Sequence, residues 1–236
     1  MIASFTIVCY RKVFIPFALL AMAVHRLPMR LQRGCTFWKL LGSGKNGTFD
    51  MHPDWQQWGL LACWDSRENF ETFYHKSFIS KWWRLFGVEK WTLLCEPLQS
   101  HGKWDGKEPF GSPNIENYNG HIAILTRATI RFSKLKSFWA NVDGVAMLMR
   151  TAPGFITSFG VGERPLYRQA TFSAWNSLDE MRAFAYGSKE HAEVIRKTRD
   201  ERWYSEELFA RFKPIASIGT LNNTDPLKGL IKFDEL

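Results

Sequence analysis

One pattern of residues occurs twice in the chain and constrains its fold more than any other feature. The first copy begins at Trp64 and the second at Trp175, and both read W-x-S, six further residues, then F-x-x-x-S. A glycine-rich triplet upstream also recurs, as Gly42-Ser43-Gly44 and as Gly160-Val161-Gly162. Self-similarity of this kind is typical of a repeated structural unit. We therefore expect both halves of the chain to fold in the same way.

The same order of elements is predicted in both halves: strand, helix, two strands, helix, strand. Alternation supports the strands, because Ala170, Phe172 and Ala174 fall on one face and Thr171 and Ser173 on the other. In the first half we expect strands over Phe5–Arg11, Phe37–Leu41, Trp58–Cys63 and Trp91–Cys95, and helices over Ile15–Leu31 (interrupted near Pro28) and Arg67–Phe86. In the second half we expect strands over Ile122–Arg131, Phe155–Val161, Arg168–Ala174 and Phe212–Ile218, and helices over Ser133–Arg150 and Leu178–Ala210 (broken near Arg202). Ser66 and Ser177 stand where helix N-caps belong.

This order, βαββαβ twice over, predicts an α+β protein made of tandem ferredoxin-like repeats. Each such sheet leaves one face bare, and two copies can press those faces together as a pseudo-dimer that resembles a dimeric α/β barrel. We expect a first repeat over 1–97, a Gly- and Pro-rich linker over 98–120, a second repeat over 121–220 and a loosely attached tail over 221–236.

Aromatic residues are abundant, with 19 Phe, 11 Trp and 6 Tyr in 236 residues. Large flat side chains suit an ordinary core, and they also suit a pocket for a long or flat apolar ligand. A core is the commoner use of such residues.

The net charge is +8, but the basic residues are spread along the chain. Nucleic-acid-binding proteins concentrate such charges around a recognisable motif, and the sequence contains neither feature, so no nucleic acid is expected. The excess is either an ordinary solvated surface or an attraction to anionic lipids or an acidic protein.

The four cysteines occur singly, without the spacing of a zinc site, which favours a reducing cytoplasm. The apolar segment Val13–Val24 faintly imitates a signal peptide. It is shorter than the roughly 20 residues that span a bilayer. Its removal would take the opening strand and helix from the first repeat, so we interpret it as part of the fold.

Familiar catalytic motifs are missing from the sequence. Gly42 to Gly47 satisfies G-x-G-x-x-G, but no helix start follows to bind a phosphate, so it predicts a strand-to-strand loop. No Ser-His-Asp elbow, HExxH or P-loop occurs. An enzyme of this kind would need an external oxidant or a cofactor for its reactivity.

His191 is the one histidine predicted to lie on a helix with an apolar side. A neutral imidazole there can ligate a haem iron at an apolar cavity. From the residues alone, a helix histidine paired with a carboxylate such as Glu190 is the commoner arrangement.

Several segments together resemble the spheroidene monooxygenase family of acyclic carotenoid ketolases. The resemblance extends over about residues 5 to 220 and rests on the order of its motifs. They are Phe37-Trp38-Lys39-Leu40-Leu41-Gly42-Ser43-Gly44, Gly102-Lys103-Trp104-Asp105-Gly106 with Pro109-Phe110, Leu125-Thr126-Arg127-Ala128-Thr129, Gly160-Val161-Gly162-Glu163-Arg164-Pro165, Gln169-Ala170-Thr171-Phe172-Ser173-Ala174-Trp175, His191-Ala192-Glu193, and Arg199 with Trp203 to Phe212.

The resemblance implies a monooxygenase that contains haem b and acts on an acyclic carotenoid with O2 and reduced ferredoxin. Successive hydroxylations at C2 give a gem-diol, which loses water to a 2-keto group. A basic cytoplasmic protein in peripheral contact with the inner membrane face suits both a membrane-borne substrate and an acidic ferredoxin.

Site residues follow from the same resemblance. His191 lies within a family motif and becomes the expected haem ligand, and therefore the expected metal ligand. Arg127 and Lys39 are candidates for pairing with haem propionates or polarising bound dioxygen. The aromatic residues that become candidates to line the substrate pocket are Trp38, Trp64, Phe155, Phe172 and Trp175.

Two other functions stay open. One is a cofactor-free monooxygenase or isomerase acting on another small apolar molecule, and the other is a non-catalytic carrier of haem or an apolar ligand. Arg164-Pro165-Leu166 and Phe155 to Ser158 differ from the carotenoid enzymes' pattern, which leaves the substrate open as well.

Overall fold

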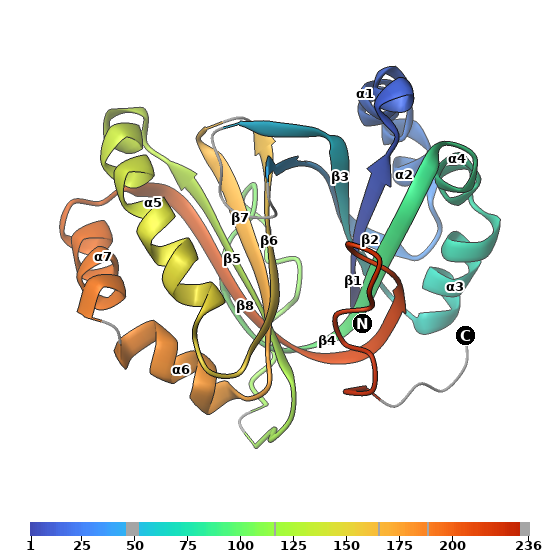
Figure 1. Cartoon of the computed structure of the whole chain (residues 1–236). Helices are drawn as coiled ribbons and strands as arrows, with labels where there is room; N and C mark the ends of the chain where they lie inside the picture. Colours follow the sequence, from blue (N-terminus) through green and yellow to red (C-terminus); the bar gives the residue numbers. More distant parts are fainter. Residues whose placement is uncertain (46–51, 116, 165, 188, 232–236) are drawn as a thin grey trace. The chain divides into compact units, whose positions relative to one another are not determined.

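The computed structural model of the chain describes residues 1–45, 52–115, 117–164, 166–187 and 189–231, and it has an α+β fold (Figure 1). The chain divides into two compact units. The first unit comprises Met1–Ser43, Asp54–Pro97 and Pro214–Leu236, and the second unit comprises Gly44–Pro53 and Leu98–Lys213.

In the first unit a central strand, β1, pairs with β3 on one side and with β4 on the other, both antiparallel. The strand order is β4-β1-β3-β2, as in a ferredoxin-like sheet. The elements are β1 (Ile2–Tyr10), a 3₁₀ turn (Lys12–Phe14), α1 (Ile15–Val24), α2 (Arg26–Leu31), β2 (Cys35–Gly44), β3 (Pro53–Trp64), α3 (Arg67–Lys76), α4 (Phe78–Phe86) and β4 (Gly87–Gly102).

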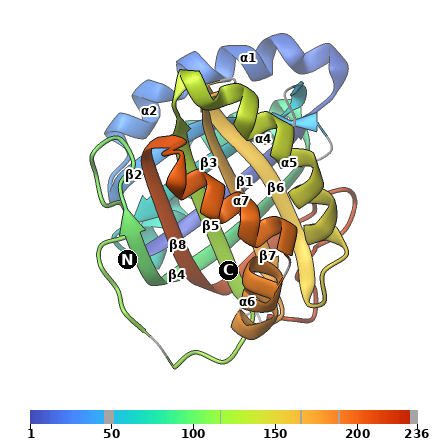
Figure 2. The same ribbon diagram turned by 90° about the vertical axis from the view of Figure 1, so that its left-hand side faces the viewer.

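The second unit repeats this element order, and its strands follow the order β8-β5-β7-β6. Figure 2 shows α5, α6 and α7 in front of the sheet, so these helices cover one of its faces. The elements are β5 (Ile122–Ile130), a 3₁₀ turn (Phe132–Lys134), α5 (Leu135–Arg150), β6 (Phe155–Arg164), β7 (Arg168–Trp175), α6 (Leu178–Gly187), α7 (Lys189–Asp200) and β8 (Tyr204–Gly219). The long strands β4 and β8 each contribute residues to both units.

Both predicted N-caps are confirmed. The Ser66 hydroxyl accepts a hydrogen bond from the Asn69 N–H at 3.3 Å, and the Ser177 hydroxyl accepts one from the Glu180 N–H at 3.2 Å. Each serine satisfies a backbone donor that the first helical turn leaves without a partner. The recurring W-x-S pattern thus marks the start of α3 and of α6.

In the predicted helix over Leu178–Ala210 the break near Arg202 is confirmed, but the helix expected after that break is wrong. The helix ends at Asp200, Arg202 takes a left-handed conformation with φ of 50°, and the chain enters β8 at Tyr204. Along β8 alternate residues are buried, which is the period of a strand. Pairing with β5 overrides the helical spacing that the apolar residues of this segment also satisfy.

Other boundaries also differ from the prediction. The helix over Arg67–Phe86 divides at Ser77, whose hydroxyl caps α4, and the N-terminal helix breaks at His25 instead of near Pro28. β4 continues to Gly102, into the predicted linker. The tail is not loosely attached over its first residues, because Leu221 and Leu227 are buried in the described structure.

His25 lies between α1 and α2 and is 2% exposed, with the rings of Phe78, Trp82 and Trp83 around it. Burial lowers its pKa to about 4, whereas a histidine of the unfolded chain binds a proton near pH 6.5. The unfolded state therefore binds more protons between these values, and the stability that the neutral ring provides is lost as the pH falls through this window.

We expect the wild-type protein to lose about 2.5 kcal/mol of unfolding free energy between pH 7 and pH 4.5 that His25→Leu does not lose. Urea unfolding at a series of pH values measures this difference. His75→Leu removes an exposed histidine and is the matched control. Equal pH slopes for the wild type and His25→Leu would rule out a neutral buried imidazole.

Candidate functional site

The helix-covered faces of the two sheets are filled differently. In the first unit one continuous cluster occupies this space, with Leu60, Trp64, Phe73 and Trp83 among its buried members. Among the residues of the second unit whose side chains the structure describes, one apolar cluster surrounds Trp175 and another surrounds Trp203.

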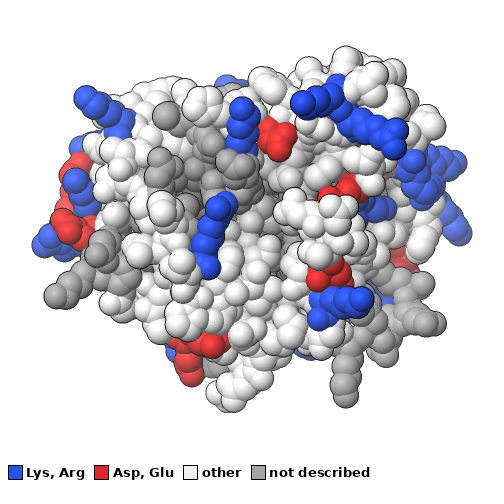
Figure 3. Space-filling model, in the orientation of Figure 1, with Lys and Arg blue, Asp and Glu red and all other residues white. Residues whose placement is uncertain are grey.

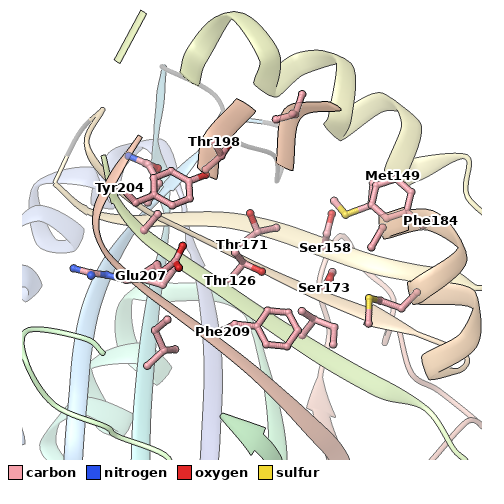
Figure 4. Close-up of a pocket in the computed structure, with 18 of the residues that line it drawn as sticks. Thr126, Met149, Ser158, Thr171, Ser173, Phe184, Thr198, Tyr204, Glu207 and Phe209 are labelled. Carbon is pink, nitrogen blue, oxygen red and sulfur yellow. The ribbon is translucent and has the colours of Figure 1, made fainter. Parts of the chain in front are cut away.

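A cavity of about 460 Å³ is lined by residues of both clusters of the second unit. Figure 4 shows its floor, made by β5, β6, β7 and β8, and the α7 residue Thr198 at one end. Met149, Met181 and Phe184 form an apolar wall. This volume lies within the range of small-molecule and cofactor pockets.

The sequence opens this cavity by exchanging apolar residues for polar ones. The strand registers align the two sheets residue by residue, and Thr171 then takes the position that Leu60 has in the first unit. In the same way Arg211 takes the position of Leu94. Leu60 and Leu94 are both buried in the first unit's core, so the second unit lacks apolar volume at the corresponding places.

Hydroxyl groups follow one another across the cavity floor. Thr126 of β5 pairs with Thr171 of β7, and Ser173 of β7 pairs with Ser158 of β6. Figure 4 shows these four side chains on the cavity side. Thr126 is exposed even though its strand lies between two others, as expected of a residue that faces a cavity. The floor can therefore exchange hydrogen bonds with a polar part of a ligand.

Arg211 brings a positive charge to the cavity. Its Nε atom is buried and finds no hydrogen-bond partner among the described residues, and its guanidinium carbon lies 5.6 Å from the centroid of the Phe209 ring. Burial and the nearby charge of Arg182 lower the pKa of Arg211. A buried donor of this kind suits a ligand carboxylate, which would supply both a hydrogen bond and a negative charge.

Tyr204 borders the cavity beside Thr198, whose hydroxyl forms a hydrogen bond with it (Figure 4). Burial raises the pKa of Tyr204 to about 12. The phenol is therefore protonated at neutral pH and able to donate a hydrogen bond.

Arg127 lies on β5 and is 1% exposed. It forms ion pairs with Glu206, with Glu163 at 3.4 Å and with Asp105 at 3.9 Å, and its guanidinium lies 5.3 Å from the Trp104 ring. Although it also borders the cavity, its charge is engaged by these carboxylates. Burial raises the pKa of Glu206, but the N–H groups of Gly106 and Asp105 and the charge of Arg127 hold it below its ordinary value.

The motif from Gly102 to Gly106 forms the turn that these ion pairs hold. Gly102 has φ of 85°, and a Cβ atom there would lie 2.3 Å from the Glu207 carbonyl oxygen. The Trp104 indole is buried and donates a hydrogen bond to Glu163 at 2.9 Å. The backbone requires glycine at position 102, because any side chain would collide with β8.

His191 falls on α7, but its side chain lies outside the described residues. Its backbone position is three residues before Val194 and seven before Thr198, and both of these residues line the cavity. Positions with this spacing share one face of a helix.

The structure does not gather the five predicted aromatic residues around one pocket. Trp175 lines the cavity. The Phe155 ring packs edge-on against the Trp175 ring, and Phe172 stacks on Phe159. Trp38 and Trp64 belong to the core of the first unit. Lys39 lies on β2 of that unit, with its Nζ atom 5.4 Å from the centroid of the Phe37 ring.

The sequence did not point to several residues of the cavity. Tyr204 falls in the helix predicted over Leu178–Ala210, Arg211 lies just after it, and His101, which borders the cavity and stacks on Phe209, falls in the predicted linker. Comparing the two halves position by position could have drawn attention to Thr171. Within the described part of the chain, no group of three or more His, Cys, Asp or Glu side chains is placed to hold a metal ion.

Three spheroidene monooxygenases are similar in sequence to this chain. It is 36% identical to the protein of Cereibacter sphaeroides over 207 residues, which are 87% of this chain and 64% of that protein. It is 32% identical to the protein of Rhodobacter capsulatus over 215 residues, which are 90% and 89% of the two chains. The third, from Rubrivivax gelatinosus, is 34% identical over 187 residues, 79% of this chain and 71% of that protein. The chain thus spans less than two thirds of the Cereibacter protein.

Solved structures share the fold at low sequence identity. A crystal structure of an aldoxime dehydratase in complex with butyraldoxime matches 97% of this chain and 84% of its own, with a TM-score of 0.66 and 11% identity. A second aldoxime dehydratase structure has a TM-score of 0.65 at 12% identity, over 96% of this chain and 86% of its own. No protein-family model matches the chain. The relation to the Rhodobacter capsulatus protein, which extends over nearly the whole of both chains, shows that this chain belongs to the spheroidene monooxygenase family.

Proposed function

We propose that the chain is a haem-dependent monooxygenase that introduces a 2-keto group into an acyclic carotenoid of the spheroidene type. The observation that carries this proposal is the cavity of the second unit, which opens where the first unit has a filled core. The names of the family members point to the reaction and to the carotenoid. Reduced ferredoxin is the proposed electron donor, and the proposed location is the cytoplasm, in peripheral contact with the inner membrane face.

The residues present suit haem b in three respects. Position 191 of α7 shares a helix face with two cavity residues, so His191 would be the residue to hold the haem iron. The unsatisfied Nε atom of Arg211 suits a propionate carboxylate. The apolar wall suits the porphyrin surface. When bound, haem would supply the activation of O2, which these side chains cannot perform.

The chain's own residues would hold and orient the reactants. Met149, Met181 and Phe184 would exclude water from the apolar part of the cavity. The hydroxyls of Thr126 and Thr171 would hydrogen-bond polar atoms, including the hydroxyl groups of a gem-diol before it loses water. Tyr204 would donate a proton in a hydrogen bond, because its raised pKa keeps it protonated.

The predicted roles of Arg127 and Lys39 have different support. The ion pairs of Arg127 suit a residue that positions β5 and β8 beneath the cavity, more than one that contacts dioxygen directly. Lys39 lies in the first unit, whereas the cavity belongs to the second. Its role stays a prediction.

We further propose that the two units are tandem copies of one ferredoxin-like repeat. Matching turns support this in addition to the element order. In the second unit Glu206 binds the N–H groups of a turn that follows Gly102. In the first unit Glu89 binds those of a turn that follows Gly219.

Turnover tests the proposed function. We expect the purified chain, supplied with haem, reduced ferredoxin, O2 and an acyclic carotenoid, to form the 2-keto product, and to form none when ferredoxin is omitted. Product analysis by chromatography and mass spectrometry measures this. Haem binding without product would indicate a carrier, and turnover without haem would indicate a cofactor-free enzyme; either result would overturn the proposal.

A further inference from the structure

In helix α1 the pattern of buried and exposed side chains is the reverse of that expected for a helix on a water-exposed surface. Its small residues Ala18 and Ala21 point inward and are 1% and 5% exposed. Its large residues point outward, with Phe17 37%, Leu19 44% and Leu20 48% exposed. A helix that packs on a core in water buries its large apolar side chains. The outer face of α1 is therefore suited to apolar surroundings.

The exposed apolar face extends beyond α1. Phe17 stacks on Phe86 of α4 with ring centroids 4.3 Å apart, which joins the two helices into one surface. We call this surface the apolar ridge. It consists of Val13, Phe17, Leu19, Leu20, Leu27 and Leu31, together with Phe78 and Leu85 of α4, all more than a third exposed. Contiguous exposed apolar side chains of this kind mark an interaction site.

The charged residues in the two segments that carry the apolar ridge all have one sign. Residues 11–33 and 78–88 contain no Asp or Glu. The basic residues in these two segments are Arg11, Lys12, Arg26, Arg30, Arg33, Lys81 and Arg84, and all seven are exposed. Figure 3 shows basic side chains at the edge of the molecule where Figure 1 places α1, α2 and α4. A partner that fits this surface would present an apolar region with negative charges around it.

The segment Lys12–Leu31 has the length and hydropathy of a membrane-spanning helix, and only 22% of it is buried. The fold nevertheless excludes a spanning orientation. The strands on either side of the segment, β1 and β2, belong to the same sheet. The helix also breaks at His25, which leaves α1 with 10 residues and about 15 Å of length. That is half the thickness of a bilayer's hydrocarbon core.

We propose that the apolar ridge docks on the surface of an anionic lipid bilayer. The ridge side chains enter the boundary between headgroups and acyl chains, with α1 lying in the membrane plane, and the basic residues bind lipid phosphates. This docking rests on the first unit alone, so it stands or falls separately from haem binding.

Vesicle co-sedimentation tests the proposal with the whole chain. We expect binding to vesicles of phosphatidylglycerol mixed with phosphatidylcholine, and much weaker binding to phosphatidylcholine alone. Leu20→Asp with Leu27→Asp should weaken the binding by at least about 100-fold, because two leucines no longer enter the lipid. Met147→Asp with Ile115→Asp is the matched control, because these apolar residues are at least as exposed but lie in the second unit.

A second pair of variants tests the charges. Arg30→Gln with Arg33→Gln should weaken binding to the anionic vesicles by about 25-fold, at about five-fold per residue, whereas the exposed Lys136→Gln of α5 should change it little. Circular dichroism verifies that the variants are folded. The docking would be refuted if the wild-type protein did not bind anionic vesicles. It would also be refuted if both the double leucine variant and the double arginine variant bound like the wild type. A wild-type dimer that Leu20→Asp with Leu27→Asp separates, without vesicle binding, would assign the ridge to a second copy of the chain instead.

Discussion

Replacing Arg127 with methionine is expected to lower the free energy of unfolding by about 3 to 5 kcal/mol. The guanidinium is 1% exposed and lies among the carboxylates of Glu206, Glu163 and Asp105. Without the guanidinium, the three partly buried carboxylates would repel one another with less positive charge nearby. Glu163 and Glu206, which bind the turn from Gly102 to Gly106, would then lose the positive charge that holds them in place.

Chemical denaturation with urea measures the Arg127→Met effect. The matched control is Lys134→Met, which breaks the ion pair of Lys134 with Glu201 at 3.0 Å. Both of those side chains are about one third exposed, so we expect a much smaller loss than for Arg127→Met. If Arg127→Met cost no more than Lys134→Met, the carboxylate cluster would not be a structural centre of the second unit.

The second large effect concerns the cavity floor. Thr126→Trp is expected to weaken haem binding by about 100-fold, because the indole would occupy the space above the centre of the floor. Thr126 is exposed to the cavity in the folded chain, so the added volume does not collide with packed core. The free energy of unfolding should therefore stay close to that of the wild type.

Thr36→Trp is the control for Thr126→Trp, because Thr36 is also an exposed strand threonine but lies on β2 of the first unit. Titration with haem, followed by visible absorption, measures the affinity of both variants. Equal haem affinity in Thr126→Trp and the wild type would place haem outside this cavity.

The sequence was sufficient for features that depend on neighbouring residues. The α+β class is confirmed, and the element order βαββαβ occurs in both halves. The caps at Ser66 and Ser177 form as predicted, because an N-cap involves only the next three residues. The break near Arg202 is confirmed, but the helix predicted after it is wrong, because the apolar residues there fit a helical and a strand period, and only pairing with β5 decides between them.

The site depends on residues far apart in the sequence, which explains what was missed. Arg127 was singled out, but its partners Asp105 and Glu206 come from a turn and from the last strand. The cavity results from the replacement of apolar core residues, and Thr171 at the position of Leu60 becomes informative only when the two sheets are aligned. Trp64 and Trp175 recur in the same motif, yet Trp64 packs in the core of the first unit and Trp175 lines the cavity of the second.

A visible absorption titration tests whether the cavity of the second unit binds haem through His191, as proposed. Purified chain should bind one haem with a Soret band that is lost or shifted in His191→Ala. His101→Ala, which removes the histidine among the described residues that line the cavity, should keep the wild-type spectrum. A Soret band that His191→Ala leaves unchanged would contradict the assigned ligand, and a chain that binds no haem would contradict the account as a whole.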